Sequence, residues 1–350
     1  MKASSNNPKT NQLGSGLKEK QILDAIKKSG YPLQKEIANL SRRRFFVTEE
    51  WTYNDPDSQE LRAIDMLATM NFTKPNEYTS KLRLYPNLAL IIECKKSDLP
   101  YIFFLCPKPL MIPNFPIFAG LKTDIMQITT NDSASSWQTR IVEALSLSNH
   151  QFFQKSECCN LFAKCVRTGK KIKFSGTESF HGIILPTLKA MRQLKIALAP
   201  KPTTAFFHFH MIIGIGVIDA PMIAVEASGE SPNLTFMPWI RVIRHEMGER
   251  PMFTHSERLF AIEIVHKDFF QEYLDKHLLP FAEEFSKLAK KHQKVLTSGQ
   301  GFAKDMNKYN WHNLESRLQE KKIRHSAVRI KMIIRNLIAV LAGRKPPYSE

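Results

Sequence analysis

The pattern of apolar and polar positions opens with two helices. Ile22, Leu23 and Ile26 form one apolar face, and Gly30 follows where a left-handed helix end favours glycine. The second helix follows Pro32 and ends in a run of three arginines. Residues 1–16 are rich in Ser, Asn, Lys and Gly and offer little to bury, so they are expected to be a disordered leader.

Strand-like runs then replace the helical pattern. Apolar, aromatic and β-branched residues predict four strands, at 45–53, 61–69, 88–95 and 101–106. The second half predicts helices at 138–148, 182–198 and 269–279, a hairpin of two buried strands at 206–227 turning at 219–221, and a strand at 259–265. This order indicates a mixed α/β fold, with a mixed central sheet and helices on both sides.

Charge is the feature that departs most from an ordinary globular chain. The chain has 50 Lys and Arg against 33 Asp and Glu, a net charge of +17. Residues 286–350 hold 15 of these cations and only four acids, so +11 of the total falls there. Such an excess predicts a polyanionic partner, and nucleic acid is the commonest.

The basic segment suggests its own contact residues. Within 286–350, a helix at 326–341 is predicted from the shared apolar face of its isoleucines and leucines. The residues expected to contact phosphates are Lys287, Lys290, Lys291, Lys294, Lys321, Lys322 and Arg324. The alternatives are a solvated surface facing an acidic protein, or an anionic membrane. The membrane reading is disfavoured because the apolar face of 326–341 has no Trp or Phe anchor.

Cysteine usage and the N-terminus favour a cytoplasmic protein. The five cysteines are odd in number and none pairs as C-x-x-C, which suits reduced thiols. No apolar core follows Lys2, so no signal peptide is expected. The longest apolar stretch, 211–225, is broken by Gly214, Gly216 and Pro221, too short and interrupted to span a bilayer.

Candidate chemistry concentrates in two of the predicted strands. Asp65 lies in one apolar strand, and Glu93 and Lys95 lie two residues apart in another. Side chains alternate along a strand, so Glu93 and Lys95 share a face, and Asp65 meets them if the strands pair. Two converging carboxylates suit a hard cation such as Mg²⁺, and the backbone carbonyl of Cys94 adds an oxygen ligand. The alternative is that these charges are ordinary residues of solvated strand faces.

Three segments in order carry a family resemblance. The sequence reads GYPLQKEIA at 30–38, RAIDMLA at 62–68 and LIIECK at 90–95. It resembles the PD-(D/E)XK, or restriction-endonuclease-like, nuclease superfamily, in the bacterial and archaeal branch reading "GYPLE-x-EVA … REIDVLA … LVIECK". The resemblance is strong over 17–96 and fainter up to about residue 279. It departs from the pattern at Gln34, where some relatives carry the acid, and at Ala63, where an acidic residue is common.

The resemblance implies a fold, a reaction and a set of roles. Residues 17–285 would form a nuclease-like domain with an insertion after the strand holding Glu93, and 286–350 a basic helical extension. Asp65 and Glu93 would hold Mg²⁺, or Mn²⁺ in its place, Lys95 would be the catalytic lysine, and Glu36 the acid of the first helix. The expected activity is hydrolysis of phosphodiester bonds, with DNA favoured over RNA as substrate.

Other functions stay open at this point. Some members of the superfamily have lost activity, so the alternative is a catalytically inactive nucleic-acid-binding module of a defence or repair complex. A homodimer or a partner within such a complex is also open. The segment HEMGE at 245–249 lacks the second histidine of a zinc-protease motif, and His208 and His210 lack a third metal ligand in view, so both are interpreted as packing or pairing residues.

Overall fold

The structure is a computed structural model that describes residues 2, 4–77, 82–109, 112–226, 232–245, 259–306, 308–310 and 312–322. The predicted helix at 326–341 and Arg324 lie outside the described residues, as does most of the HEMGE segment. Within the described part of the chain, no helix is long and apolar enough to cross a membrane.

The N-terminal third follows the predicted order. Helices α1 (Glu19–Lys28) and α2 (Tyr31–Ser41) precede a meander of three long strands, β1 (Phe46–Asn54), β2 (Leu61–Asn71) and β3 (Leu84–Lys96). β1 pairs antiparallel with β2, and β2 with β3. β3 is buried along almost its whole length, which explains why 88–92 is continuously apolar instead of alternating.

A large mixed sheet organises the described residues. Its remaining strands are β4 (Tyr101–Leu105), β5 (Ile117–Ala119), β8 (Glu157–Thr168), β9 (Lys171–Ser175), β10 (Phe207–Asp219), β11 (Met222–Glu226), β12 (Asn233–Phe236), β13 (Trp239–His245) and β14 (Leu259–His266). Twelve described strands form it, in the main order β1-β2-β3-β10-β14-β13-β8-β4-β11-β12. β10 lies parallel between β3 and β14, so the sheet is mixed and confirms the α/β class.

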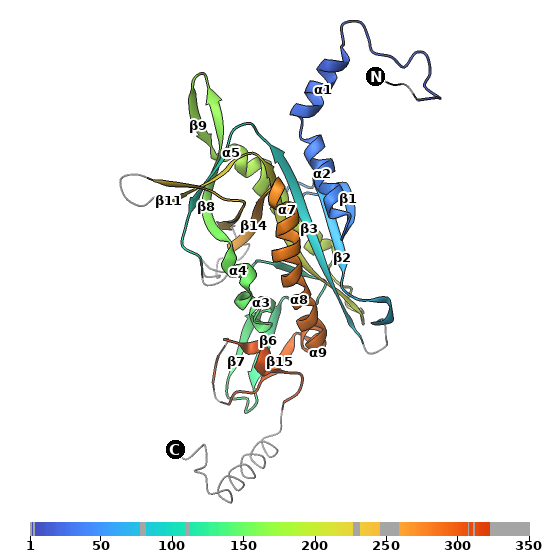
Figure 1. The fold of residues 1–350 in the computed structure, drawn as a ribbon. Coiled ribbons are helices and arrows are strands. Elements are labelled where there is room, and N and C mark those ends of the chain that lie inside the picture. Colours follow the sequence, from blue (N-terminus) through green and yellow to red (C-terminus); the bar gives the residue numbers. More distant parts are fainter. Residues whose placement is uncertain are drawn as a thin grey trace, which may run out of the picture.

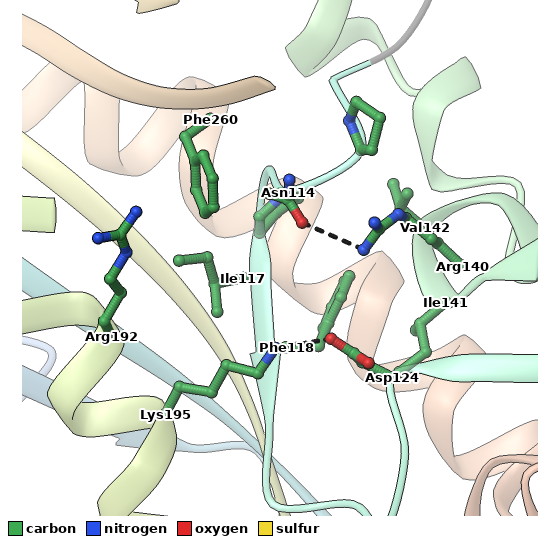
Figure 2. Close-up of a pocket in the computed structure, with 12 residues that line it drawn as sticks. Asn114, Ile117, Phe118, Asp124, Arg140, Ile141, Val142, Arg192, Lys195 and Phe260 are labelled. Carbon is green, nitrogen blue, oxygen red and sulfur yellow. Dashed lines mark hydrogen bonds and ion pairs between the residues drawn. The ribbon is translucent and has the colours of Figure 1, made fainter. Parts of the chain in front are cut away.

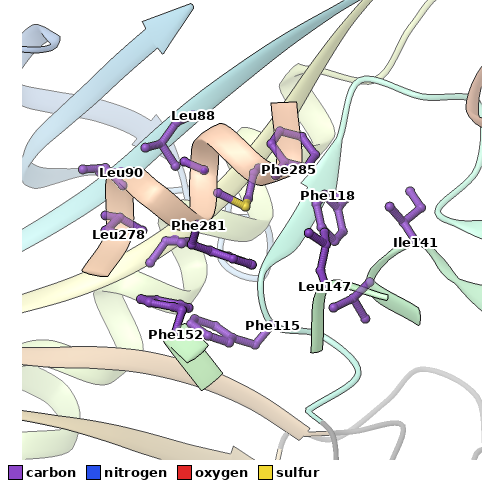
Figure 3. Packing of buried hydrophobic residues seen from close by; sticks show 14 of the residues in the cluster. Leu88, Leu90, Phe115, Phe118, Ile141, Leu147, Phe152, Leu278, Phe281 and Phe285 are labelled. Carbon is purple, nitrogen blue, oxygen red and sulfur yellow. The ribbon is translucent and has the colours of Figure 1, made fainter. Parts of the chain in front are cut away.

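Helices cover both faces of this sheet (Figure 1). The face bearing Leu88 and Leu90 packs under α8 (Leu279–Lys291), whose Phe281 and Phe285 point into the shared core (Figure 3). On the opposite face, Ala89 and its neighbours pack under α6 (Leu185–Ala197). A single turn of π-helix, Phe180–Ile184, which we call the π-turn, leads into α6. Both faces of β3 are therefore shielded from solvent, except at its carboxyl end.

The predicted hairpin at 206–227 is wrong. β10 and β11 are both buried strands, but four strands stand between them in the sheet order. Instead, β10 pairs parallel with β3, and β11 pairs parallel with β4. The loop from β3 to β4 runs beside the loop from β10 to β11, because the Ser97 N–H donates to the Asp219 carbonyl at 3.1 Å and the Tyr101 N–H donates to the Pro221 carbonyl at 2.9 Å. An apolar run specifies burial of a strand without specifying its partner.

The segment at 138–148 is also only partly as predicted. β7 (Ser136–Arg140) occupies its start, followed by the short helix α3 (Ile141–Ala144). β7 pairs with β6 (Ile125–Thr130) in a second, smaller sheet. The remaining short helices are α4 (Gln151–Lys155), α5 (Gly176–Ser179), α7 (Phe270–Glu272) and α9 (Gln293–Ser298).

The C-terminal extension joins the core instead of forming a separate helical unit. The expected boundary after residue 285 falls inside α8, where Phe285, Ser286 and Ala289 are buried. β15 (Gln300–Ala303) then pairs parallel with β6, and β16 (Leu318–Gln319) pairs with β15. The described part of the extension thus contributes strands as well as helices, because its apolar residues complete a sheet begun near residue 125.

Candidate functional site

The candidate site forms where β2 and β3 separate. Their paired register ends at Met66 and Ile92, and Asp65 and Glu93 are the next residues on each strand. The Cys94 N–H donates to Oδ2 of Asp65 at 2.6 Å. The Asp65 carboxylate therefore satisfies a backbone donor that the end of the ladder leaves open, which fixes this side chain beside the Glu93–Lys95 segment.

Glu93 and Lys95 occupy one face of β3, as the alternation of the strand predicts. Glu93 is only 7% exposed, and its Oε1 forms an ion pair with Nζ of Lys95. The Lys95 side chain is 34% exposed, so the ammonium lies at the boundary between the protein and solvent. Asp65, Glu93 and Lys95 are thus brought together at the carboxyl end of β3, next to β10.

Burial and neighbouring charges raise the pKa values of the two acids. Burial raises the pKa of Glu93 to about 7, and the negative charge of Asp65 adds to this rise against the opposing effect of Lys95. Burial also raises the pKa of Asp65, while the Cys94 N–H and Lys95 pull in the opposite direction. Two neighbouring buried carboxylates whose ionisation is disfavoured form a site that favours an added cation.

Lys95 and Cys94 differ in what they offer to this site. Burial lowers the pKa of Lys95, but the Glu93 and Asp65 carboxylates outweigh it, so the pKa rises overall and the ammonium stays charged. Burial raises the pKa of the Cys94 thiol well above its usual value, so the thiol stays protonated. Cys94 therefore offers its backbone carbonyl, not a thiolate, as a ligand.

Gln34, not Glu36, is the residue of α2 that faces the site. Glu36 is exposed on the outer side of the helix, whereas Gln34 is buried. The Gln34 Nε2 donates to the Asp65 carbonyl at 3.1 Å and to Oε1 of Glu50 at 2.6 Å. The structure does not bring Glu36 to the group, because two residues along a helix turn a side chain about 200° around its axis.

Glu50 is a member of this neighbourhood that the sequence analysis missed. Its φ of +48° breaks the regular course of β1, and its negative charge raises the pKa of Asp65. A non-glycine residue with positive φ in a strand is uncommon and marks a local constraint. The available signal was the adjacent pair Glu49–Glu50, which breaks the alternation of polar and apolar positions in that strand.

The turn before α6 lies over the site. A Cβ added to Gly182 would lie 3.6 Å from Cε of Lys95, so the π-turn runs close over the lysine stem. Tyr53 of β1 is buried nearby, its hydroxyl donates to the Pro186 carbonyl at 3.1 Å, and burial raises its pKa to about 12. These neighbours cover the stem of Lys95 and leave its side chain partly exposed.

The donor set fits a hard cation. Asp65, Glu93 and the Cys94 carbonyl supply only oxygen, the ligand type that Mg²⁺ and Mn²⁺ prefer. Among the described residues, no group of three or more His, Cys, Asp and Glu side chains has metal-binding geometry. A cation held here would therefore rely on two side-chain carboxylates, backbone oxygen and water.

Several lysines proposed for nucleic-acid contact are engaged in ion pairs. Lys290 bonds Glu77 at 2.6 Å, Lys291 bonds Glu315 at 2.6 Å, and Lys294 bonds Glu320 at 2.7 Å. Lys322 donates to the Ser133 hydroxyl at 2.6 Å. Lys287 and Lys321 are exposed. Much of the charge expected to face phosphates therefore ties α8 and α9 to neighbouring loops.

A pocket lies away from the candidate site, beside the last turns of α6 (Figure 2). Its cations are engaged within it: Lys195 pairs with Asp124 at 2.6 Å, Arg140 donates to Asn114 at 3.1 Å, and Arg192 lies 5.5 Å from the Phe260 ring centre. Asp65, Glu93 and Lys95 do not line it.

Comparisons with known proteins give no family assignment. No family model matches this sequence, and the chain matches no curated protein and no solved structure.

Proposed function

We propose that this protein is a metal-dependent nuclease of the PD-(D/E)XK class, hydrolysing nucleic-acid phosphodiester bonds at Asp65, Glu93 and Lys95. One observation carries the proposal: two carboxylates from neighbouring strands converge at a strand end, and a charged lysine lies against one of them. The antiparallel β1-β2-β3 meander, followed by the parallel strands β10 and β14, supports a restriction-endonuclease-like core.

The residues suit this chemistry by charge and position. Asp65 and Glu93 would hold Mg²⁺ or Mn²⁺, with the Cys94 carbonyl as a third oxygen, and the ion would polarise the phosphoryl oxygen and supply hydroxide. Lys95, charged and at the surface, would donate hydrogen bonds to the phosphate and stabilise the charge that develops on it. Gln34 would hold Asp65 and Glu50 in place through its amide.

A cleavage assay tests the proposal. DNA and RNA, single- and double-stranded, would be incubated with the wild-type protein in Mg²⁺, in Mn²⁺ and in EDTA, beside Asp65→Ala and the control Glu36→Gln. We expect cleavage that requires the metal, is lost in Asp65→Ala and persists in Glu36→Gln, because Glu36 is exposed. Cleavage by Asp65→Ala at the wild-type rate would place the reaction elsewhere.

The alternative is a nucleic-acid-binding module without activity. It is favoured by Gln34, an amide at the helix position where some relatives of the resembled class carry an acid, and by the ion pair between Glu93 and Lys95. Binding of nucleic acid with no cleavage in either metal, and no metal-induced rise in thermal stability, would select this function.

A further inference from the structure

A basic β-hairpin projects from the large sheet. β8 and β9 pair antiparallel around Gly169, whose φ of +61° makes the tight turn, and β9 has no other strand partner among the described residues. Residues 164–173 include five cations and no acid. The segment was not singled out from the sequence, because its charge is small beside the excess in 286–350.

The cations of this hairpin are available for binding. Lys164 pairs with Glu178 at 3.2 Å. The other four side chains are exposed, and within the described part of the chain none of them forms an ion pair; they are Arg167, Lys170, Lys171 and Lys173. This contrasts with Lys290, Lys291 and Lys294, whose charges are offset by Glu77, Glu315 and Glu320.

The hairpin is connected directly to the candidate site. From Lys173 the chain passes through α5 into the π-turn, where Gly182 lies over Lys95. Figure 1 shows β9 and the carboxyl end of β3 at the same end of the molecule, with β6, β7 and β15 at the opposite end. A duplex held by the hairpin would therefore lie at the end of the molecule that carries the carboxyl end of β3, away from β6, β7 and β15.

We propose that the 164–173 hairpin is a DNA-binding arm that holds duplex DNA against the Asp65–Glu93 site. The inference rests on the proposed nuclease function and names its substrate class. A two-stranded β-ribbon fits the major groove of B-DNA, and exposed cations on it supply phosphate contacts. Ile172 and Phe174, 55% and 60% exposed, provide apolar contact beside those cations.

Two triple variants with equal loss of charge test the arm. Lys170→Gln/Lys171→Gln/Lys173→Gln removes three charges from the hairpin, and Lys287→Gln/Lys304→Gln/Lys321→Gln removes three exposed charges from the extension. Both are made in a Glu93→Gln background with EDTA, so that binding is measured without cleavage. Binding to a labelled duplex is followed by fluorescence anisotropy across a salt series, and thermal unfolding confirms that each variant is folded.

We expect the hairpin variant to bind duplex DNA roughly tenfold or more weakly, and its slope of log affinity against log salt to flatten by about 0.9 for each lost phosphate contact. The extension variant changes Lys287 and Lys321, the rival candidates for phosphate contact; because the arm places the duplex on the hairpin instead, this variant should bind with nearly the slope of the Glu93→Gln parent. Equal weakening by both variants, or none by the hairpin variant, overturns the arm while leaving the proposed function in place.

Two further measurements distinguish failure of the proposed function from failure of the hairpin proposal. If the Glu93→Gln protein with its basic residues intact binds no nucleic acid, the proposed function fails, and the arm with it. If that protein binds vesicles of phosphatidylserine and phosphatidylcholine through the hairpin but not duplex DNA, the hairpin is a membrane contact and the proposal is overturned. Binding of DNA that depends on the hairpin charges supports it.

Discussion

Asp65 and Glu93 illustrate how single residues acquire chemistry from their surroundings. Each lies one residue outside the β2–β3 pairing, Asp65 just before Met66 and Glu93 just after Ile92, so the ladder between these two strands ends at the carboxylates. Burial raises the pKa of both acids, and Lys95 offsets part of the cost for Glu93. The same residues in a regular, solvated stretch of strand would have ordinary pKa values, and their carboxylates would not share a bound cation.

Removing the charge of Glu93 should separate cutting from binding. Glu93→Gln keeps the size of the side chain but removes a carboxylate from the proposed metal site, so cleavage should fall below detection while affinity for DNA stays within about threefold, because the exposed cations are unchanged. Lys95→Ala should lose most activity and keep metal binding. Cleavage by Glu93→Gln at the wild-type rate would exclude Glu93 from the reaction.

His210 should make stability depend on pH. Burial, with a contribution from His208, lowers its pKa from 6.5 to about 4, and its buried Nδ1 has no hydrogen-bond partner among the described residues. Between these pH values the unfolded chain binds a proton that the folded chain does not, so stability is full above about pH 6.5 and falls toward pH 4, by at most about 3 kcal/mol.

The comparison that isolates this effect is His210→Gln. Denaturant unfolding of both proteins at pH 7 and at about pH 4 gives the two losses of stability, and the wild type should lose more. The carboxylates titrate equally in both proteins and cancel in the difference. Equal losses in the two proteins would show that His210 does not carry the dependence.

At the scale of elements, α8 shows why the extension cannot be treated as a detachable tail. Its inner side buries Phe281 and Phe285 against the β3 face, and its outer side presents charge. Lys290 and Lys291 of α8 and Lys294 of α9 pair with acids of neighbouring segments, so reversing these three lysines to Glu would break three ion pairs as well as change the surface charge.

Two substitutions in α8 should separate packing from surface charge. Phe285→Ala opens a cavity between α8, Phe118 and Phe209, and should lower the free energy of unfolding by about 3–5 kcal/mol. Lys287→Ala changes an exposed position of the same helix and should cost less than about 0.5 kcal/mol. Chemical denaturation measures both. Similar small losses for the two variants would mean that α8 is not anchored by this face.

At the scale of the whole molecule, a buried ion pair joins distant segments. Arg241 of β13 and Glu263 of β14 are 1% and 0% exposed, and Nη2 of Arg241 lies 2.6 Å from Oε1 of Glu263. Arg241 also donates to the Phe152 carbonyl of α4 at 3.2 Å and lies 4.6 Å from the Phe115 ring centre. The Arg241 guanidinium therefore links β13 to β14, to α4 and to the loop before β5.

Breaking this pair from one side should be more damaging than replacing both partners. Arg241→Met leaves the Glu263 charge buried and should destabilise the fold by about 3–5 kcal/mol. Adding Glu263→Gln removes that charge and keeps an acceptor for the Trp239 N–H, so the double variant should recover part of the loss. A double variant whose loss equals the sum of the two single losses would show that the pair is not coupled.

The local elements and the candidate acids can be predicted from the amino-acid sequence. The 61–69 and 88–95 runs are strands, and alternation alone put Glu93 and Lys95 on one face, because side-chain direction in a strand follows from backbone geometry. Helical periodicity likewise predicted α1, α2 and α6 close to their observed bounds. These features depend on residues near one another in the chain.

The pairing of the strands and the exposure of the charges depend on contacts between residues that are distant in the chain. β10 lies between β3 and β14 instead of pairing with β11, and Gln34 instead of Glu36 meets Asp65. The lysines of 286–294 are largely offset by acids far away in sequence, while four cations of the smaller 164–173 group remain exposed. Net charge is a sum over residues, but the field that a ligand meets depends on their neighbours in space.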